Sequence, residues 1–506
     1  MSYSVKGYSI EALIKLFADK TQAPENQIRD KLHIIFFKSY FNDLKAKTIV
    51  IEEAYVDHDY LEDYSYYYVK SFKHYDRFCI RLHFFSVKFN SDDFKEILAS
   101  ISRKFDLNIL QKNYLGFIVL KPLPQTFIGR TCLKTYPSKN KRFFPFSRTY
   151  EINLFGLELT VESIAFQEQD SVVAACASSA IWSAFQVTGI LFQHFIPTPV
   201  EITKSAIEII PDSSRHFPNK GLSPEQMAQA IRNIGLDPLF IVNTDKEILK
   251  ATVYAYQRAK IPLIMGMDLI EYNDGTKPLG KHSVVVTGYS MGTKTSQFHN
   301  EDFYLTSSRI AKLYVHDDQV GPFARMEFSK IRNQLTTSWT DSQGEPGNVN
   351  GEPDILIIPL YPKIRISFVL ILGLVSKLNE YINFVTKKVG IRIPKIEWDI
   401  FLSKSNDFKV EIRNSKKINN NYKEEILLVP MPRYIWRAIG SMQNDRIEFI
   451  FDSTDIEQGD IFLKLISNDN SILNLFKLIA NHIDTKKLKQ KPLAKIFEVL
   501  RSTPNK

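Results

Sequence analysis

Cys176 is the residue of this chain best placed to act as a nucleophile. It begins a predicted helix that continues through Ala180, Ile181 and Phe185. A thiol at the N-terminus of a helix lies at the positive end of the helix dipole, which favours the reactive thiolate. The neighbours of Cys176 are small, being Ala174, Ala175, Ala177, Ser178 and Ser179. A substrate could therefore approach the sulfur, although a cysteine at such a position can also be a buried apolar residue.

His282 is the candidate general base. It directly precedes a β-branched run over residues 283–287, which predicts a strand that ends at Gly288. A histidine at the start of a strand is held rigidly, as is required of a base that must meet a thiol within hydrogen-bonding distance. The alternative is a strand histidine without a chemical role.

Two carboxylates, Asp317 and Asp318, follow His282 by 35 and 36 residues at the end of a predicted strand over 311–316. A carboxylate there can accept a hydrogen bond from the imidazole and fix its tautomer and orientation. Because alternate residues of a strand face opposite sides, Asp317 shares a face with the apolar residues two and four positions before it. That face is expected to point inward. Asp317 is therefore favoured, and Asp318 stays open.

An upstream glutamine is the last candidate. A thiol peptidase needs hydrogen-bond donors for the oxyanion of its tetrahedral intermediate, and the backbone N–H of Cys176 can provide one of them. A side-chain amide ahead of the cysteine can provide another. Gln169 lies seven residues before Cys176 and Gln167 nine residues before it, and we predict Gln169.

The order of these residues resembles the papain-like superfamily of cysteine peptidases. The resemblance lies in Gln169, then Cys176-Ala-Ser-Ser-Ala-Ile-Trp, then Gly280-Lys-His282-Ser-Val-Val-Val-Thr-Gly-Tyr, and then Tyr314-Val-His-Asp317. Within the superfamily the pattern is similar to the bacteriocin-processing peptidase branch, which uses Cys, His and Asp with an upstream Gln. It covers about residues 165–330.

This resemblance implies a papain-like domain, in which the nucleophile helix packs on an antiparallel sheet. It also implies hydrolysis of a peptide or isopeptide bond through an acyl-enzyme on Cys176. Two positions depart from the family pattern. Family members commonly have Gln six residues before the cysteine, where this chain has Asp170, and often have Pro after the triad Asp, where it has Asp318.

Two other classes of protein fit the same residues. Transglutaminases and arylamine acetyltransferases also use Cys, His and Asp and also form a thioester, so they differ only in the acceptor of the acyl group. The upstream Gln favours the peptidase, because the transferases usually lack it. A papain-like fold can also bind peptides without catalysis, but loss of the cysteine or histidine would be expected then, and both are present.

The elements that must position these residues predict an α+β protein with three domains. An N-terminal α+β domain of unknown role covers 1–150 and ends in a basic, Pro- and Ser-containing linker over 134–148. The papain-like domain covers 151–340, and a second α+β domain of unknown role covers 352–506. In the middle domain, Ser223 and Pro224 predict the start of a helix that ends at Gly235, and a further helix is expected over 246–258.

Composition restricts the remaining possibilities. The net charge of +9 is spread over 506 residues, so nucleic-acid binding is not favoured. The three cysteines are too few for a disulfide framework and indicate a reducing compartment. The most apolar run, Ile366 to Val375, is too short to span a bilayer and predicts a buried helix. No signal-peptide-like stretch opens the chain. We therefore expect a cytoplasmic protein.

Motifs for bound groups are missing from the sequence. It contains neither a Walker loop nor a Gly-x-Gly-x-x-Gly motif, and it has no paired His or Cys at the spacing of a zinc site. We therefore predict no cofactor and no metal. The expected partner is a protein or peptide substrate, and the oligomeric state is left open.

Overall fold

A computed structural model describes the following residues of the chain: 3–21, 23–170, 175–208, 221–242, 245–272, 275–299, 302–329, 333–457, 459–467 and 470–503. As predicted, the protein is mixed α+β and contains several antiparallel sheets. Its residues fall into two units. Unit 1 comprises Met1–Thr244, Pro262–Ser290 and Ala311–Pro359, and unit 2 comprises Asp245–Ile261, Met291–Ile310 and Leu360–Lys506.

This grouping crosses the domain boundaries expected from the sequence. The residues of the predicted N-terminal and middle domains pack together in unit 1, whereas residues 245–261 and 291–310 belong with the C-terminal residues in unit 2. The division into three domains stays a prediction. The candidate residues Cys176, His282 and Asp317 all lie in unit 1.

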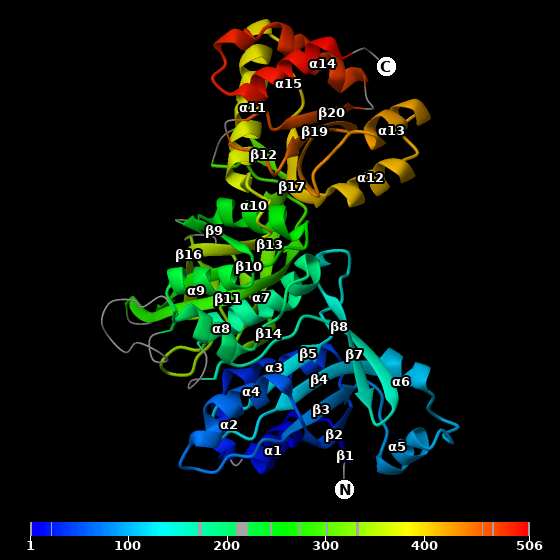
Figure 1. Ribbon diagram of the computed structural model, residues 1–506, viewed down its shortest axis with the longest axis vertical. Coiled ribbons are helices and arrows are strands. Elements are labelled where there is room, and N and C mark those ends of the chain that lie inside the picture. The colour runs from blue at the N-terminus through cyan, green and yellow to red at the C-terminus, as the bar shows by residue number, and fades with distance from the viewer. Residues whose placement is uncertain are drawn as a thin grey trace. The chain divides into compact units, whose positions relative to one another are not determined.

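Unit 1 begins with an antiparallel sheet whose five strands follow each other in chain order (Figure 1). The strands are β1 (Tyr3–Gly7), β2 (Thr48–Tyr55), β3 (Cys79–Phe85), β4 (Tyr114–Leu120) and β5 (Ile128–Leu133). Helices α1 (Ile10–Thr21), α2 (Glu25–Asp30) and α3 (Leu32–Asp43) pack on one face. Against the other face lie α4 (His58–Tyr66), the 3₁₀-helix η1 (Tyr68–Lys70), α5 (Ser91–Leu98), α6 (Leu107–Asn113) and the hairpin of β7 (Arg148–Leu154) and β8 (Leu157–Ser163).

Alternation along the strands explains these two layers. In β2, Ile49 and Ile51 belong to the apolar cluster under α1 and α3, whereas Val50 belongs to the cluster on the opposite face. Successive side chains of a strand point to opposite faces, so an apolar run such as Thr48–Ile51 supplies both cores.

The second sheet of unit 1 carries the candidate site. The strand order is β14-β13-β11-β10-β16-β15, while β6 pairs with β11 and β9 pairs with β16. The strands are β6 (Arg142–Phe143), β9 (Asp237–Val242), β10 (Leu263–Glu271), β11 (Lys277–Met291), β13 (Ile310–Asp317), β14 (Gly321–Glu327), β15 (Leu335–Thr336) and β16 (Val349–Leu360). The helices are α7 (Cys176–Phe192), α8 (Pro199–Ala206) and α9 (Pro224–Asn233).

Helix α7 is almost completely buried, because small and apolar side chains surround its whole circumference. Ala180, Ile181 and Ala184 join one apolar cluster with Ile264 of β10 and Val285 of β11. A helix that is apolar all round must be covered on every side. The sheet therefore fixes α7, and with it the position of Cys176 at its first turn.

Two details of this sheet differ from the sequence prediction. Strand β11 begins at Lys277, six residues before the expected start, because it forms a hairpin with β10 in which Glu271 pairs with Lys277. It also continues past Gly288, where a side chain would meet the carbonyl oxygen of Phe143 in β6 at 2.4 Å. Glycine at 288 therefore permits close strand pairing and does not end the strand.

The segments on either side of the middle block also differ from expectation. The predicted linker over 134–148 contains β6, which pairs with β11, and its aromatic residues Tyr136 and Phe146 are buried. Strand β16, which the sequence assigned to the C-terminal domain, pairs with β10. Strand pairing joins residues far apart in sequence, so local composition gave no signal of either contact.

Unit 2 is built on an antiparallel sheet to which β12 adds a parallel edge strand, in the order β12-β17-β18-β19-β20. Its strands are β12 (Tyr304–Leu305), β17 (Glu397–Lys404), β18 (Tyr434–Met442), β19 (Asp445–Asp452) and β20 (Phe462–Ser467). Its helices are α10 (Lys246–Gln257), α11 (Phe368–Val389), α12 (Ser405–Asn414), α13 (Asn420–Leu427), α14 (Asn470–Asn481) and α15 (Lys491–Ser502), with the 3₁₀-helices η2 (Thr306–Arg309) and η3 (Thr485–Lys487).

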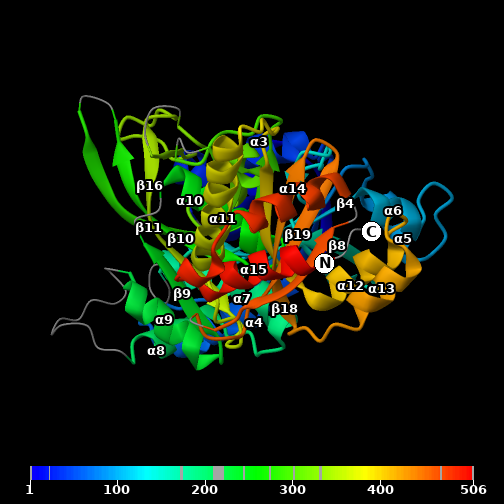
Figure 2. The same cartoon turned by 90° about the horizontal axis from the view of Figure 1, so that it is seen from above.

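Helices cover both faces of the sheet of unit 2 (Figures 1 and 2). Phe449 of β19 packs against Phe476 of α14, with the rings tilted and their centroids 5.9 Å apart. Its neighbour Ile450 instead joins Phe408 of α12 and Ile426 of α13 in a cluster on the opposite face. The period of two along β19 thus supplies two separate helix–sheet interfaces.

Helix α11 contains the most apolar run of the chain. Its 22 residues are long and apolar enough to cross a membrane by length and composition, but half of its most apolar window is buried inside the protein. Its buried side chains recur at helical spacing, as in Ile371, Val375, Leu378 and Ile382. This is the pattern of a core helix, and the buried helix expected for residues 366–375 is confirmed.

Candidate active site

Cys176 lies at the first residue of α7, as predicted. Its side chain is half-buried, whereas Ala175 and Ala177 on either side are buried. The hydroxyl of Ser178 accepts a hydrogen bond from the backbone N–H of Ala175 at 3.4 Å and so helps to cap the helix. The remaining N–H groups of the first turn have no partner within the helix, and they make this end electropositive. The thiol therefore lies where a negative charge is favoured.

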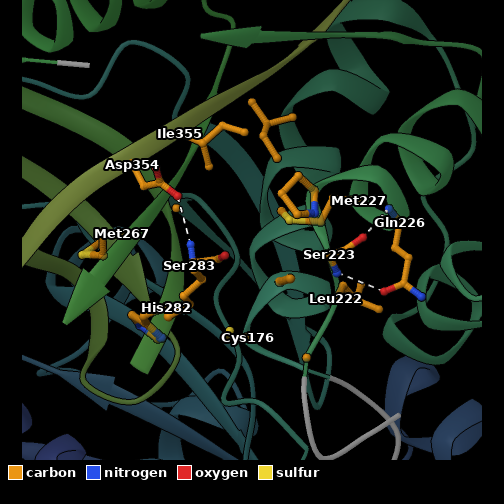
Figure 3. Close-up of a pocket in the computed structure, with 16 residues that line it drawn as sticks. Cys176, Leu222, Ser223, Gln226, Met227, Met267, His282, Ser283, Asp354 and Ile355 are labelled. Atoms are coloured by element: carbon orange, nitrogen blue, oxygen red, sulfur yellow. Dashed lines mark hydrogen bonds and ion pairs between the residues drawn. The ribbon is translucent and has the colours of Figure 1, made fainter. Parts of the chain in front are cut away.

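His282 lies on β11, paired with Met267 of β10, and its side chain is buried. It lines the same cavity as Cys176, whose thiol helps to raise the pKa of the imidazole. Its Nε2 lies 3.0 Å from Oδ1 of Asp317. Because Nε2 is directed at the carboxylate, Nδ1 is the ring nitrogen available to the thiol. Figure 3 shows Cys176 and His282 in the lower part of one cavity.

Asp317 is the last residue of β13 and is buried to 1% exposure. Besides His282, it accepts hydrogen bonds from the indole N–H of Trp339 at 2.9 Å and from the backbone N–H of Gln319 at 3.1 Å. Each carboxylate oxygen thus has a donor, which keeps the side chain in one rotamer. The structure therefore brings three of the four predicted residues together at one site, where His282 is hydrogen-bonded to Asp317 and lines the same cavity as Cys176.

The opposite charges of His282 and Asp317 stabilise each other, which shifts the pKa values of both groups. Burial alone would lower the pKa of His282, but the charge and hydrogen bond of Asp317, the hydrogen bond of Cys176 and the charge of Asp318 hold that pKa well above its ordinary value. Burial alone would raise the pKa of Asp317, but the charge of His282 and the three hydrogen bonds lower it. Near neutral pH, the imidazole is therefore protonated and Asp317 is ionised.

Trp339 is a site residue that the sequence analysis missed. Its ring meets the ring of His282 edge-on, with centroids 5.1 Å apart, while its N–H binds Asp317. It therefore covers the His–Asp hydrogen bond and limits the access of water to it. Its sequence context, a Thr- and Ser-rich segment over 336–342, carries no periodic signal. Only the rarity of tryptophan, with four in the chain, could have singled it out.

Asp318 also faces His282, contrary to the alternation that assigned it to the other face. The pairing of β13 with β14 shifts by one residue between Val315 and Asp317, and the chain then turns into β14. The carboxylate of Asp318 consequently lies 3.8 Å from Nε2 of His282. Alternation applies within a regular strand, and it fails at this irregular strand end.

The predicted oxyanion donor is less well placed. Gln169 is half-buried and is not among the described residues that line the cavity beside Cys176. The nearby Gln167 is buried, and its side-chain amide nitrogen has no hydrogen-bond partner among the described residues. Residues 171–174, which connect both to the helix, lie outside the described residues. The role of Gln169 therefore stays a prediction.

Asp170, at the position where the family commonly has Gln, has a different environment. It is buried, and both of its carboxylate oxygens accept hydrogen bonds from the phenol of Tyr68, at 2.9 and 2.7 Å. The ammonium of Lys121, which is also buried, lies 3.8 Å away. Asp170 is thus held by Tyr68 and Lys121 of the N-terminal sheet region.

A cavity of about 370 Å³ opens beside Cys176 and His282 (Figure 3). Its lining is predominantly apolar and comes from α9 and its preceding loop, from β10 and from β16: Leu222, Met227, Met267, Ile355 and Ile357. The ion pair of Lys281 and Asp354, 3.1 Å apart, lies at the exposed side. Ser223 caps α9 through a capping box with Gln226, as predicted, so this wall is rigid.

The group around His282 could also hold a cation. His282, Asp317 and Asp318 each offer one ligand atom, and these atoms lie within 4.8 Å of one another. However, the 3.0 Å separation between His282 and Asp317 is a hydrogen-bond distance, and the other oxygen of Asp317 is occupied by Trp339. The hydrogen bonds among these side chains therefore favour proton transfer over metal binding. That the protein uses no metal stays a prediction.

The other two cysteines differ from Cys176. Cys79 and Cys132 are buried, and all three thiols are free. Burial raises the pKa of Cys79 and raises that of Cys132 to about 12. Both thiols are therefore protonated and shielded, which leaves Cys176 as the one partly exposed cysteine.

Comparison with known proteins adds no further constraint to this geometry. The chain matches no protein-family profile and no curated protein.

Proposed function

We propose that this protein is a papain-like cysteine peptidase that hydrolyses a peptide or isopeptide bond. The observation that carries the proposal is the grouping of Cys176, His282 and Asp317. A thiol at a helix N-terminus lines the same cavity as a buried imidazole, and that imidazole is hydrogen-bonded to an ionised carboxylate. The apolar cavity beside the thiol offers a place for a substrate side chain. Cys176 is the nucleophile, His282 the acid and base, and Asp317 the residue that orients His282.

The reaction begins with attack of the Cys176 thiolate on the carbonyl carbon, which forms a C–S bond and moves an electron pair onto the carbonyl oxygen. The N–H of Cys176 and the amide of Gln169 donate hydrogen bonds to this oxyanion. The C–N bond then breaks as the His282 imidazolium gives its proton to the leaving amine. His282 next removes a proton from water, which attacks the thioester. Breaking the C–S bond releases the acid and restores the thiolate.

An epoxide-type thiol inhibitor tests the proposal without a known substrate. Thiolate attack opens the epoxide, and the imidazolium protonates the oxygen that is released. We expect rapid addition of a single inhibitor mass near neutral pH, measured on the intact protein, and no addition to Cys176→Ala. Cys79 and Cys132 are buried, so they should not react.

The outcome of the labelling distinguishes the proposal from a peptide-binding module. Failure of the wild type to react, or modification of Cys79 or Cys132 instead, would overturn the peptidase proposal, because Cys176 would then be inert. Once a peptide is found that acylates Cys176, the released product separates hydrolysis from acyl transfer. Water gives the free acid, whereas an added amine gives an amide in a transferase.

The shape of the cavity predicts the kind of side chain next to the scissile bond. Its walls are apolar, and Gly266 of β10 lines it without a side chain; a Cβ there would lie 2.7 Å from Cγ2 of Ile355. We expect Gly266→Ala to push Ile355 into the cavity. The kcat/KM for substrates with a large aliphatic or aromatic side chain should fall about tenfold relative to that for substrates with a small one.

A peptide library analysed by mass spectrometry measures this preference. Gly7→Ala is the matched control, because a Cβ at Gly7 meets no atom within 4 Å and the residue lies on β1 in the same unit. An unchanged preference in Gly266→Ala would show that the substrate side chain binds elsewhere.

A further inference from the structure

The carboxylate of Asp318 is a buried charged group that the mechanism above does not use. Its side chain is 4% exposed. Oδ2 accepts a hydrogen bond from the side-chain amide of Gln319 at 3.0 Å, whereas Oδ1 has no hydrogen-bond partner among the described residues. A carboxylate oxygen buried without a donor is unfavourable for folding. The position therefore calls for an explanation beyond packing.

The unpartnered oxygen is directed at the candidate catalytic pair. Oδ1 of Asp318 lies 3.8 Å from Nε2 of His282, the nitrogen that binds Asp317 at 3.0 Å. The distance is too long for a hydrogen bond, but it is short for two opposite charges in a buried site. The imidazole thus faces two carboxylates, of which only one is hydrogen-bonded to it.

A histidine from the N-terminal sheet region holds the backbone of this turn. His33 of α3 is buried, and burial lowers its pKa, so it is neutral and its Nε2–H donates to the carbonyl oxygen of Asp318 at 2.9 Å. Against the adjacent Gly321, where φ is +150°, lies the ring of Phe36 from the same helix. Helix α3 therefore fixes the turn that directs Asp318 at His282.

We infer that Asp318 is a second positioning carboxylate, which stabilises the protonated form of His282 and thereby the thiolate of Cys176. The inference rests on the proposed function. Asp317 fixes the orientation of the ring through its hydrogen bond, and Asp318 adds charge without competing for the ring N–H. Two carboxylates at the same imidazole thus have different roles, set by a difference in distance of 0.8 Å.

The charges around Asp318 give the arrangement a dependence on pH. Burial raises the pKa of Asp318 to about 6; the charge of His282 on β11 opposes this, and the charge of Asp317 adds to it. Around His33 on α3 lie two further charges, Lys31 and Glu168, which form an ion pair with each other. The buried His316 of β13 is neutral, because burial lowers its pKa to about 3. Asp318 is therefore ionised at neutral pH and protonated in mild acid, where it no longer supports the imidazolium.

Alkylation of Cys176 by iodoacetamide, followed by mass spectrometry from mild acid to pH 10 with EDTA present, measures this effect without a substrate. The wild type should show two rises in rate, the first when the thiolate forms beside the imidazolium and the second when the imidazolium loses its proton. In Asp318→Asn, the second rise should move to lower pH by about one unit, which is a tenfold loss in proton affinity. Iodoacetamide is uncharged, so the substitution does not alter its approach.

The matched control is Glu327→Gln, which removes an exposed carboxylate from β14 at the opposite end of its pairing with β13. The inference is supported if the second rise in alkylation rate moves to lower pH in Asp318→Asn and stays at the wild-type pH in Glu327→Gln. An unshifted second rise in folded Asp318→Asn, or an equal shift in the control, overturns it. A wild type without two rises would instead overturn the proposed function, since no thiolate–imidazolium pair would exist. Should the Asn variant not fold, Asp318→Ser removes the same charge.

Discussion

Replacing His282 with alanine is expected to slow the epoxide labelling of Cys176 at pH 7 by about a hundredfold to ten-thousandfold. The imidazolium has two functions in that reaction, which are to stabilise the thiolate and to give a proton to the oxygen released from the epoxide. General acid catalysis by a positioned side chain contributes about 10²–10⁴ in rate. The helix dipole still favours the thiolate in the variant, so reactivity should be slow but measurable.

The first-order rate of labelling, followed by intact mass, measures this loss. His58→Ala is the matched control, because His58 belongs to the same unit but its side chain is 67% exposed and lies on α4. Circular dichroism before labelling establishes that both variants are folded. Labelling of His282→Ala at the wild-type rate would mean that the thiol of Cys176 is activated by the helix alone, and the roles assigned to His282 would fail with it.

The sequence predicted the first half of the candidate site well, because its signals are local. Cys176 begins a helix and His282 lies in a strand. Both elements can be predicted from the few residues that follow Cys176 and His282 in the chain. The capped start of α9 at Ser223 and its end before Gly235 are equally local, and both were confirmed. A pattern of side chains with a clear period is sufficient for such elements.

The surroundings of Asp317 and Asp170 depend on tertiary contacts, which sequence patterns do not contain. Trp339 follows β15 in the chain, 22 residues after Asp317, and still donates its indole N–H to the carboxylate of Asp317. The turn after Asp317 directs Asp318 at the imidazole because of an irregular strand pairing. Asp170 lies six residues before Cys176, yet its hydrogen-bond partner Tyr68 lies 102 residues earlier in the chain than Asp170. Each of these is a tertiary contact with no local signal.

The buried ion pair of Lys121 and Asp170 leads to the second prediction, which concerns the stability of the protein. Lys121 is 3% exposed and lies 3.8 Å from the equally buried Asp170. It also faces Asp63, a buried carboxyl of α4 whose pKa is raised well above its ordinary value by burial, with Lys121 opposing that rise. Arg130 compensates the neighbouring Asp57 and Asp59 of the same region. Lys121 is therefore the cation that balances the buried carboxylate of Asp170.

We expect Lys121→Met to lower the free energy of unfolding by about 3–5 kcal/mol, the usual cost of leaving one partner of a buried ion pair without the other. Methionine fills a similar volume, so the loss reports the missing charge and not a cavity. Urea unfolding measures it, with Lys141→Met as the control for an exposed lysine.

Removing the charge of Asp170 as well tests whether the missing positive charge of Lys121 causes the loss of stability. In Lys121→Met with Asp170→Asn, the buried charge at 170 is gone while the amide can still bond to Tyr68, so the double variant should recover more than half of the loss. A double variant as unstable as Lys121→Met would mean that the uncompensated charge of Asp170 is not the cause of the loss.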